Sequence, residues 1–231
     1  MQSQTSMCPG DHLREQTPND ILAIYGTGLG LCLSILFFTI IWPILFVLVL
    51  RYQNLEAYKM KHANYLDTQN RTVTIVHEVL ISTLCGYHIM TASTLCGDST
   101  LFEQFLLTIS AGFHIYDFLA LLWLKLLDKD RFFHHTLVIA GTLYTLSQNS
   151  GAGAFVVGIS VATSSNPLCH ARKILRNLGK EYTKTYELVE CTCFVAFFIC
   201  RVIIGHPALY HFVQCPSLNY LSKLVAVGIC V

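Results

Sequence analysis

Residues 21–50 read ILAIYGTGLGLCLSILFFTIIWPILFVLVL and contain no charged side chain. About 20 consecutive apolar residues suffice to carry an α-helix across the roughly 30 Å hydrocarbon core of a bilayer. We therefore expect this run to cross a membrane as a helix that tilts or bends at Pro43. It decides the class of fold, because a chain with such a helix folds with lipid as part of its solvent.

The rest of the chain has the same apolar character. Of its 231 residues, 53% are hydrophobic and only 13% are charged, whereas a soluble domain has about 25% charged residues. A chain this short cannot bury so much apolar surface in one aqueous core. The net charge of +1 argues against a nucleic-acid partner, which would require a basic face. The composition therefore indicates an integral membrane protein.

Six further apolar segments follow the first and predict an all-α, polytopic transmembrane bundle of about seven spans. The segment at the C-terminus has too few residues to cross a bilayer, so we expect the seventh span to be truncated at Val231. The predicted spans are residues 21–50, 73–95, 101–124, 132–148, 151–168, 188–209 and 218–231.

Basic residues test this arrangement independently. Twelve of the fifteen Lys and Arg residues fall in alternate connections between the predicted spans. The positive-inside rule places these connections in the cytosol and the N-terminus in the lumen or outside the cell. The twelve are Arg51, Lys59, Lys61, Arg71, Lys125, Lys129, Arg131, Arg172, Lys173, Arg176, Lys180 and Lys184.

The predicted orientation has two consequences. Asn70 begins a glycosylation sequon, but it lies on the cytosolic side, so we expect it to carry no glycan. Cys96 and Cys215 lie on the opposite, oxidising side, where a disulfide can form. The sequence leaves their pairing open.

Ionisable side chains inside the spans are the candidate functional residues, because such groups are costly in lipid. Either His134 or His135 could serve as nucleophile, general base or metal ligand. Adjacent helical residues point about 100° apart, so at most one of them faces the bundle centre squarely. The alternative is that both mark the membrane interface beside Arg131. His114 and Asp117 share one helix face, where the carboxylate orients the histidine or the two groups only satisfy each other.

A second set of polar residues is expected at the cytosolic mouth of the bundle. With the histidine pair, His77, Arg172 and Glu190 could form a ring that binds a lipid headgroup, and Arg172 suits a phosphate or carboxylate. The other interpretation of Arg172 is a positive-inside anchor. Arg201, in the sixth span, either snorkels or pairs inside the bundle. The His and Cys spacings of a metal site are missing, so we predict no metal and no cofactor.

Four short motifs resemble, in the same order, those of the TLC-domain family, which includes ceramide synthases and the translocating-chain-associating membrane protein. They are NRTVTIVH at 70–77, GFHIYD at 112–117, FHHT at 133–136 and SNPLCHAR at 165–172. The resemblance implies a TLC domain over residues 70–231, after a lumenal tail, a membrane helix and a cytosolic loop in residues 1–69. It also implies that Asp117, His134 and His135 are candidate catalytic residues.

Departures from the family pattern guide the functional prediction. His170 replaces an asparagine, Thr163 replaces an acidic residue, and the downstream aspartate pair of the ceramide synthases is missing. The chain thus resembles the non-synthase TLC proteins, and we predict a lipid-binding protein of lipid homeostasis in the endoplasmic reticulum or another endomembrane. Two alternatives stay open. One is an N-acyltransferase that uses acyl-CoA as substrate, with His134 or His135 carrying the acyl group; the other is a structural subunit of a membrane complex or homo-oligomer.

Overall fold

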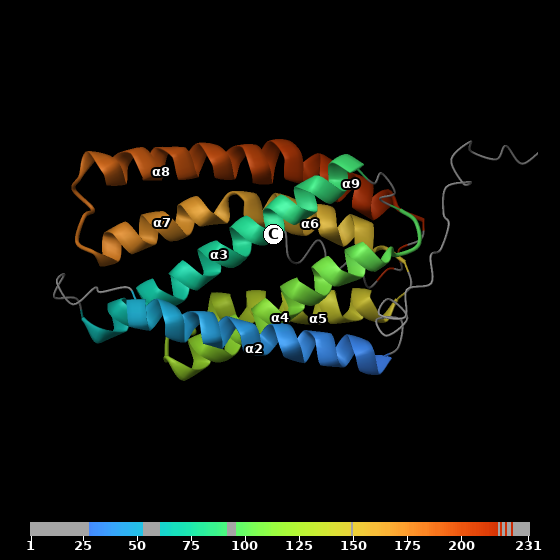
Figure 1. Cartoon of the computed structure of the whole chain (residues 1–231). Coiled ribbons are helices and arrows are strands. Elements are labelled where there is room, and N and C mark those ends of the chain that lie inside the picture. The colour runs from blue at the N-terminus through green and yellow to red at the C-terminus, as the bar shows by residue number, and fades with distance from the viewer. Residues whose placement is uncertain are drawn as a thin grey trace, which may run out of the picture.

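The computed structural model describes residues 28–52, 61–91, 96–148 and 150–216, together with residues 218, 220 and 223. These residues form a bundle of helices in which α3, His62–Thr91, runs obliquely to α7, Asn166–Asn177, and α8, Lys184–Phe197 (Figure 1). Five helical segments in this part of the chain are long and apolar enough to cross a membrane. The all-α prediction with several membrane spans is confirmed, but the predicted number of seven is wrong, since the described residues contain five.

Two predicted spans account for the difference. The segment predicted at 132–148 forms α5, Lys129–Ser147, but its first turn holds three charged residues and two histidines follow, so α5 is too polar to qualify as a span. The segment predicted at 218–231 lies outside the described residues, apart from three positions. The predicted N-terminal tail and the first residues of the 21–50 run also lie outside them.

The first three described helices are α2, Gly28–Tyr52; α3, His62–Thr91; and α4, Leu101–Trp123. The helix α3 begins well before the predicted start of its span at residue 73. Its extra turns carry an ion pair one helical turn apart, in which Arg71 Nε lies 2.8 Å from Asp67 Oδ2, and such pairs favour a helix. Part of the predicted cytosolic loop is therefore helical and packs against α7.

The span predicted at residues 151–168 is a broken helix. It consists of α6, Ala152–Ser164, and α7, Asn166–Asn177, separated at Ser165. Pro167 has no backbone N–H, so the helical hydrogen-bond ladder cannot pass through it unchanged. The last described span is also irregular, because the π-helix η3, Phe198–Ile204, joins α8, Lys184–Phe197, to α9, Gly205–Gln214.

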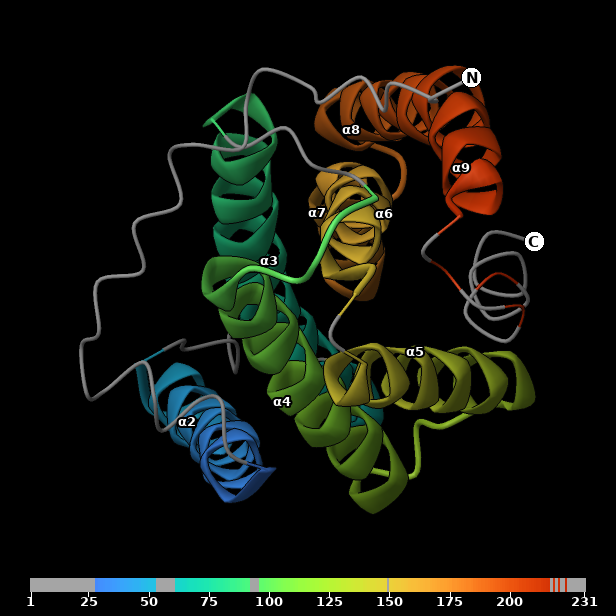
Figure 2. The ribbon, with the colours of Figure 1, turned by 90° about the vertical axis from the view of Figure 1, so that its right-hand side faces the viewer.

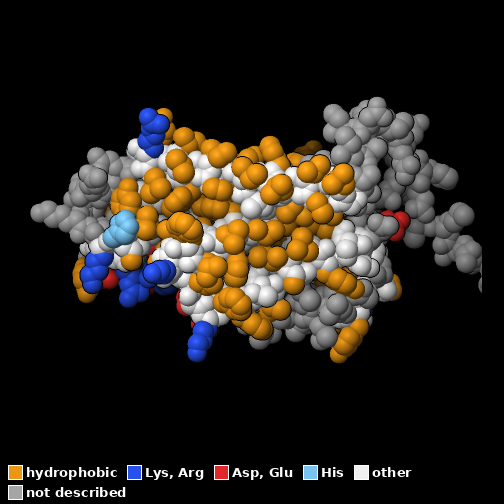
Figure 3. All heavy atoms as spheres, turned by 90° about the horizontal axis from the view of Figure 1, so that it is seen from below, with side chains coloured by type: hydrophobic (Ala, Val, Ile, Leu, Met, Phe, Trp, Pro, Cys, Tyr) orange, Lys and Arg blue, Asp and Glu red, His pale blue; other side chains and the backbone are white. Residues whose placement is uncertain are grey.

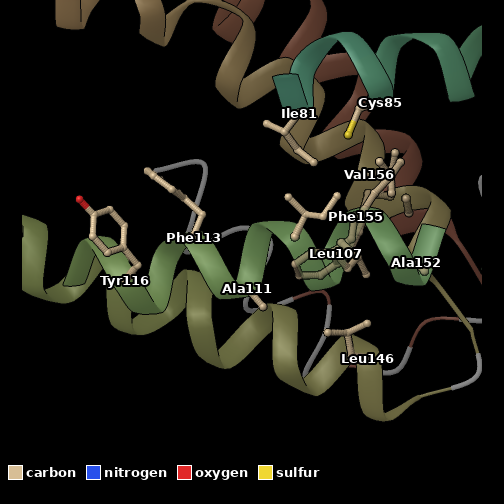
Figure 4. Close-up of a cluster of buried hydrophobic side chains, with 14 of the residues drawn as sticks. Ile81, Cys85, Leu107, Ala111, Phe113, Tyr116, Leu146, Ala152, Phe155 and Val156 are labelled. Carbon is tan, nitrogen blue, oxygen red and sulfur yellow. The ribbon is translucent and has the colours of Figure 1, made fainter. Parts of the chain in front are cut away.

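The core lies where α3, α4 and α6 meet. Ile81 of α3, Leu107 and Phe113 of α4 and Val156 of α6 belong to one cluster of buried side chains (Figure 4). Seen end-on, α2 lies on one flank of the bundle, and α8 and α9 lie on the opposite flank (Figure 2). The spans on both flanks expose most of their large hydrophobic side chains, as expected for helices in contact with lipid.

The basic residues lie toward one end of the bundle (Figure 3). Hydrophobic side chains cover the middle of the molecule, and Lys and Arg gather toward one end (Figure 3). At the opposite end of α3, Cys96 forms a disulfide with Cys215, which directly follows α9. The structure therefore resolves the pairing that the sequence left open. The bond ties the last described span to the connection between α3 and α4.

Gly112 allows a close crossing of α4 over α2. A Cβ atom at this position would lie 2.6 Å from Phe38 Cβ and 3.0 Å from the backbone nitrogen of Thr39. We expect Gly112→Leu to lower the free energy of unfolding by about 1–3 kcal/mol, because the backbone of α2 must move. Gly86→Leu is the matched control, since nothing lies within 4 Å of a Cβ there. Thermal unfolding in detergent should separate the two variants, and equal midpoints would contradict the close crossing.

Candidate functional site

A buried hydrogen-bond network joins α3, α4 and α5 inside the bundle. His135 Nε2 lies 3.2 Å from Asp117 Oδ2. The side-chain amide of Asn70 donates to Asp117 Oδ1 over 2.6 Å, and the Tyr116 hydroxyl donates to Asn70 Oδ1 over 2.9 Å. All four side chains are buried. Both carboxylate oxygens therefore have a donor, and the orientation of the Asn70 amide follows from the Tyr116 contact.

This network assigns the protonation of the histidine. Because a carboxylate only accepts hydrogen bonds, the Nε2–H of His135 donates to Asp117 Oδ2. The other nitrogen, Nδ1, is buried with no hydrogen-bond partner among the described residues, and in the neutral imidazole it holds a lone pair. A carboxylate-oriented imidazole with a free lone pair can act as general base, nucleophile or hydrogen-bond acceptor.

The two adjacent histidines of α5 have different environments. His135 is buried, whereas His134 is exposed, in agreement with the prediction that at most one of them faces the bundle centre. The contact to Asp117 is made by His135, and the ring of His134 lies beside that of His135, with ring centroids 5.7 Å apart. Of the two candidate histidines, His135 is the one that a carboxylate orients.

Four imidazoles form a row that leads from the core to the surface, and we call it the histidine row. The centroids of His77 and His114 are 6.0 Å apart, and those of His114 and His135 are 5.8 Å apart. His134 follows at the exposed end. Like His135 Nδ1, both nitrogens of His77 and Nδ1 of His114 are buried without a partner in the described part of the chain.

His77 lies deeper than the cytosolic ring expected from the sequence. It is fully buried, stacks on Phe113 at 3.7 Å between centroids, and meets Trp42 edge-on at 5.2 Å. Trp42 comes from α2, so a helix that precedes the TLC motifs contributes to the site. The inner end of the histidine row is thus surrounded by aromatic side chains, which suit an apolar group carrying a few polar atoms.

A second polar network runs along α3 and α7. Arg71 pairs with Asp67, and its NH1 lies 3.0 Å from His170 Nδ1. Because a guanidinium only donates, Nδ1 of His170 accepts and Nε2 carries the proton. That Nε2 lies 3.5 Å from Oε1 of Glu78, a buried carboxylate. His170, a departure from the family pattern, thus bridges an arginine and a glutamate.

The same network continues to the helix break and to the π-helix. Asn166, the first residue of α7, donates to Glu78 Oε1 over 2.8 Å. From η3, Arg201 NH2 donates to the backbone carbonyl of Ala162 over 3.2 Å and lies 3.5 Å from Asn166 Oδ1. Near a helix break, carbonyls lose their usual partners, and a cation there is favourable. Of the two alternatives for Arg201, the structure therefore shows pairing inside the bundle.

Arg172 and Glu190 have partners of their own. Arg172 NH1 lies 3.1 Å from Glu190 Oε1, and the Tyr186 hydroxyl donates to the same oxygen over 3.2 Å. The Arg172 and Glu190 side chains are about half exposed, at 45% and 47%. His77 instead contacts the aromatic core. Among the described residues, the three expected headgroup ligands therefore divide into a deep histidine and a surface ion pair.

One further buried pair has a structural explanation. His88 Nε2 lies 2.9 Å from Glu103 Oε1, and Glu103 also closes a capping box with Thr100 at the start of α4. Both carboxylate oxygens of Glu103 therefore have a partner, Oε2 in the capping box and Oε1 at His88. This pair lies at the disulfide end of α3, and it stabilises the connection between α3 and α4.

Sequence reasoning missed Asn70 and Tyr116 as parts of the site. The sequence predicts Asn70 only as the start of an unused sequon and of the first family motif, although its side chain is buried and hydrogen-bonded to Asp117. Both residues occur inside the motifs that carried the family resemblance. Their position next to charged motif residues was the available signal. For Trp42, no such signal exists in the sequence.

The fold and the buried network define a multi-pass helical membrane protein with a histidine–carboxylate site inside the bundle. The sequence model of the TLC domain matches residues 67–229, and the chain belongs to the TLC-domain family. The resemblance predicted from the four motifs is therefore confirmed. No solved structure matches the chain.

Proposed function

We propose that this TLC-domain protein binds a membrane lipid inside its bundle, with the polar part of the lipid against the histidine row. One observation carries the proposal: the row contains several buried nitrogen atoms without partners in the described residues, on His77, His114 and His135. A buried polar atom left unpaired costs about 1–3 kcal/mol. A hydroxyl, ester or amide of a bound lipid would supply the missing partners.

The surroundings of the row support a lipid rather than a soluble ligand. Trp42 and Phe113 flank His77, and apolar walls with few polar groups are typical of small-molecule sites. The row ends at the exposed His134, beside the exposed Phe132 and Phe133. A lipid could approach along this surface of α5. A role in lipid homeostasis within the endoplasmic reticulum or another endomembrane, with the basic end in the cytosol, belongs to this proposal.

Replacing His77 by phenylalanine tests lipid binding. His77→Phe keeps the stack on Phe113 and removes two unpaired nitrogens, so we expect unchanged or higher thermal stability. We expect this variant to retain several-fold less co-purified lipid, because phenylalanine cannot make the polar contact of the His77 nitrogens with the lipid. Substitutions that stabilise a protein at a binding site commonly weaken its function in this way. Mass spectrometry of extracted lipids measures the retention, and His62→Phe, at an exposed position, is the control. Equal lipid content in wild type and both variants would refute the proposal.

The Asp117–His135 pair favours one second candidate, acyl transfer from acyl-CoA to an amine. His135 Nδ1 would attack the thioester carbonyl; the acyl–nitrogen bond forms as the carbon–sulfur bond breaks, and the coenzyme leaves as the thiol with the imidazole proton. An amine then takes the acyl group and restores the imidazole. Intact-mass spectrometry would detect an added acyl chain on wild type and on His134→Ala but not on His135→Ala. Identical masses for all three would leave lipid binding alone.

A further inference from the structure

A small cavity opens at the basic end of the bundle, between the start of α3, the start of α5 and the end of α7. Its volume is about 160 Å³, and the polar residues that line it are Asn64, Asp67, Arg131, Lys173 and Asn177. Its lining combines two cations with one carboxylate. The ion pairs that these three groups already make therefore decide which ligand charge the cavity favours.

The carboxylate in the cavity is already occupied. Asp67 Oδ2 lies 2.8 Å from Arg71 Nε and accepts from Asn177 Nδ2 over 2.8 Å. Its other oxygen, Oδ1, lies 4.0 Å from Arg131 NH1. Arg131 in turn pairs with Asp128, its Nε lying 3.2 Å from Asp128 Oδ2. Both acids are therefore balanced by arginines.

Lys173 is the charge that remains. It lines the cavity and is partly buried, and it has no ion-pair partner within the described residues. Arg131 lies in the same wall with its side chain 34% exposed. An ammonium and a guanidinium that share a concave site attract an anion, and phosphate accepts charge-assisted hydrogen bonds from both.

We propose that this cavity binds a phosphate monoester through Lys173 and Arg131. Asp67 lies five residues after the first residue of α3, about 8 Å along the helix axis, which corresponds to the headgroup level if α3 spans the bilayer. Asn70 follows one helical turn deeper and binds Asp117. The cavity and the Asp117 network therefore share helix α3, through Asp67 and Asn70. If the phosphate belongs to a lipid, this inference rests on the proposed function and adds that the lipid headgroup is a phosphate monoester.

The experiment uses the full chain in nanodiscs of phosphatidylcholine that contain equal small amounts of phosphatidic acid and diacylglycerol with the same acyl chains. The two lipids differ only by the phosphate monoester. We expect wild type to retain phosphatidic acid about tenfold over diacylglycerol, from charge-assisted contacts. Lys173→Gln should lose most of this preference. Lys184→Gln, at an exposed position of another helix, should keep it. Equal retention of the two lipids by wild type, or equal behaviour of the two variants, overturns a lipid phosphate site.

Inorganic phosphate separates the sources of the ligand and the two proposals. Phosphate that stabilises wild type thermally but not Lys173→Gln, without any lipid preference, assigns the site to a soluble phosphate compound. Wild type that retains lipids without preferring phosphatidic acid, and gains no stability from phosphate, refutes the cavity site but leaves the proposed function intact. Wild type that retains no lipid refutes the proposed function, and the response to phosphate then decides the cavity site separately.

Discussion

Asp117→Ala is expected to lower the free energy of unfolding by about 3–5 kcal/mol, because removing one partner leaves a buried polar network uncompensated. Asp117 is the acceptor for both His135 Nε2 and the Asn70 amide, and all three side chains are buried. For a chain of this size, that loss corresponds to a fall of roughly 6–20 °C in the thermal midpoint. Thermal unfolding of the purified protein in detergent measures the change.

Two comparisons show whether the loss arises from this network. Asp130→Ala removes a carboxylate from an exposed position at the start of α5, where the expected effect is below about 1 kcal/mol. Asp117→Asn keeps the volume but replaces one acceptor oxygen by a donor, so either the His135 tautomer or the Asn70 amide orientation must change. We expect this variant to be far more stable than Asp117→Ala, yet to lose any chemistry at Nδ1. A midpoint for Asp117→Ala equal to that of Asp130→Ala would be inconsistent with the network.

Loss of the Cys96–Cys215 disulfide is expected to have the next largest effect. The bond joins residues separated by 119 positions, and removal of a native disulfide typically costs about 2–4 kcal/mol. At the same end of the last described span, Phe212 of α9 packs on Phe155 of α6 at 5.8 Å between ring centroids. We expect Cys96→Ala/Cys215→Ala to lower the thermal midpoint by roughly 4–16 °C.

Thiol counting provides an independent readout for the disulfide. After denaturation without reductant, maleimide labelling of wild type should modify two fewer cysteines than after reduction. The double variant should show no such difference. Cys32→Ala, at an exposed free cysteine, is the control for stability. Labelling that does not depend on reductant in wild type would mean that the two thiols are free.

Hydropathy located the helices well but counted the spans incorrectly. The predicted span at 101–124 matches α4, Leu101–Trp123, almost residue for residue. The predicted start of the second span at 73 was too late, because α3 continues as a helix through Asp67, Arg71 and other polar residues. Hydropathy measures the cost of moving side chains into lipid, and it does not detect polar helical turns that other helices cover. The span predicted at 132–148 was wrong for another reason: the helix that contains it, α5, starts with a charged turn and is too polar as a whole to qualify as a span.

The candidate site, like the spans, could be predicted only in part from the sequence. Motif order and residue type were enough to select Asp117, His134 and His135. They did not decide which histidine meets the carboxylate, since that depends on how far α5 is rotated about its axis. They also placed His77 with Arg172 and Glu190, because distance along a span was the available measure of depth. In the structure His77 packs against Trp42 and Phe113, and the other two residues pair with each other.

The amino-acid sequence by itself determined that the protein has helices apolar enough to cross a membrane and that its fold is all-α. It also determined that the basic residues cluster toward one end and that the chain belongs to the TLC-domain family. Each of these depends on properties that add along the chain, namely apolar length, charge distribution and the order of motifs. Only the tertiary structure decided that His135 rather than His134 meets Asp117, that Asn70 and Trp42 belong to the site, and that Arg201 spans the gap to the break between α6 and α7. These contacts join residues far apart in the chain, and they depend on helix rotation and crossing, which packing fixes only when all the helices are present.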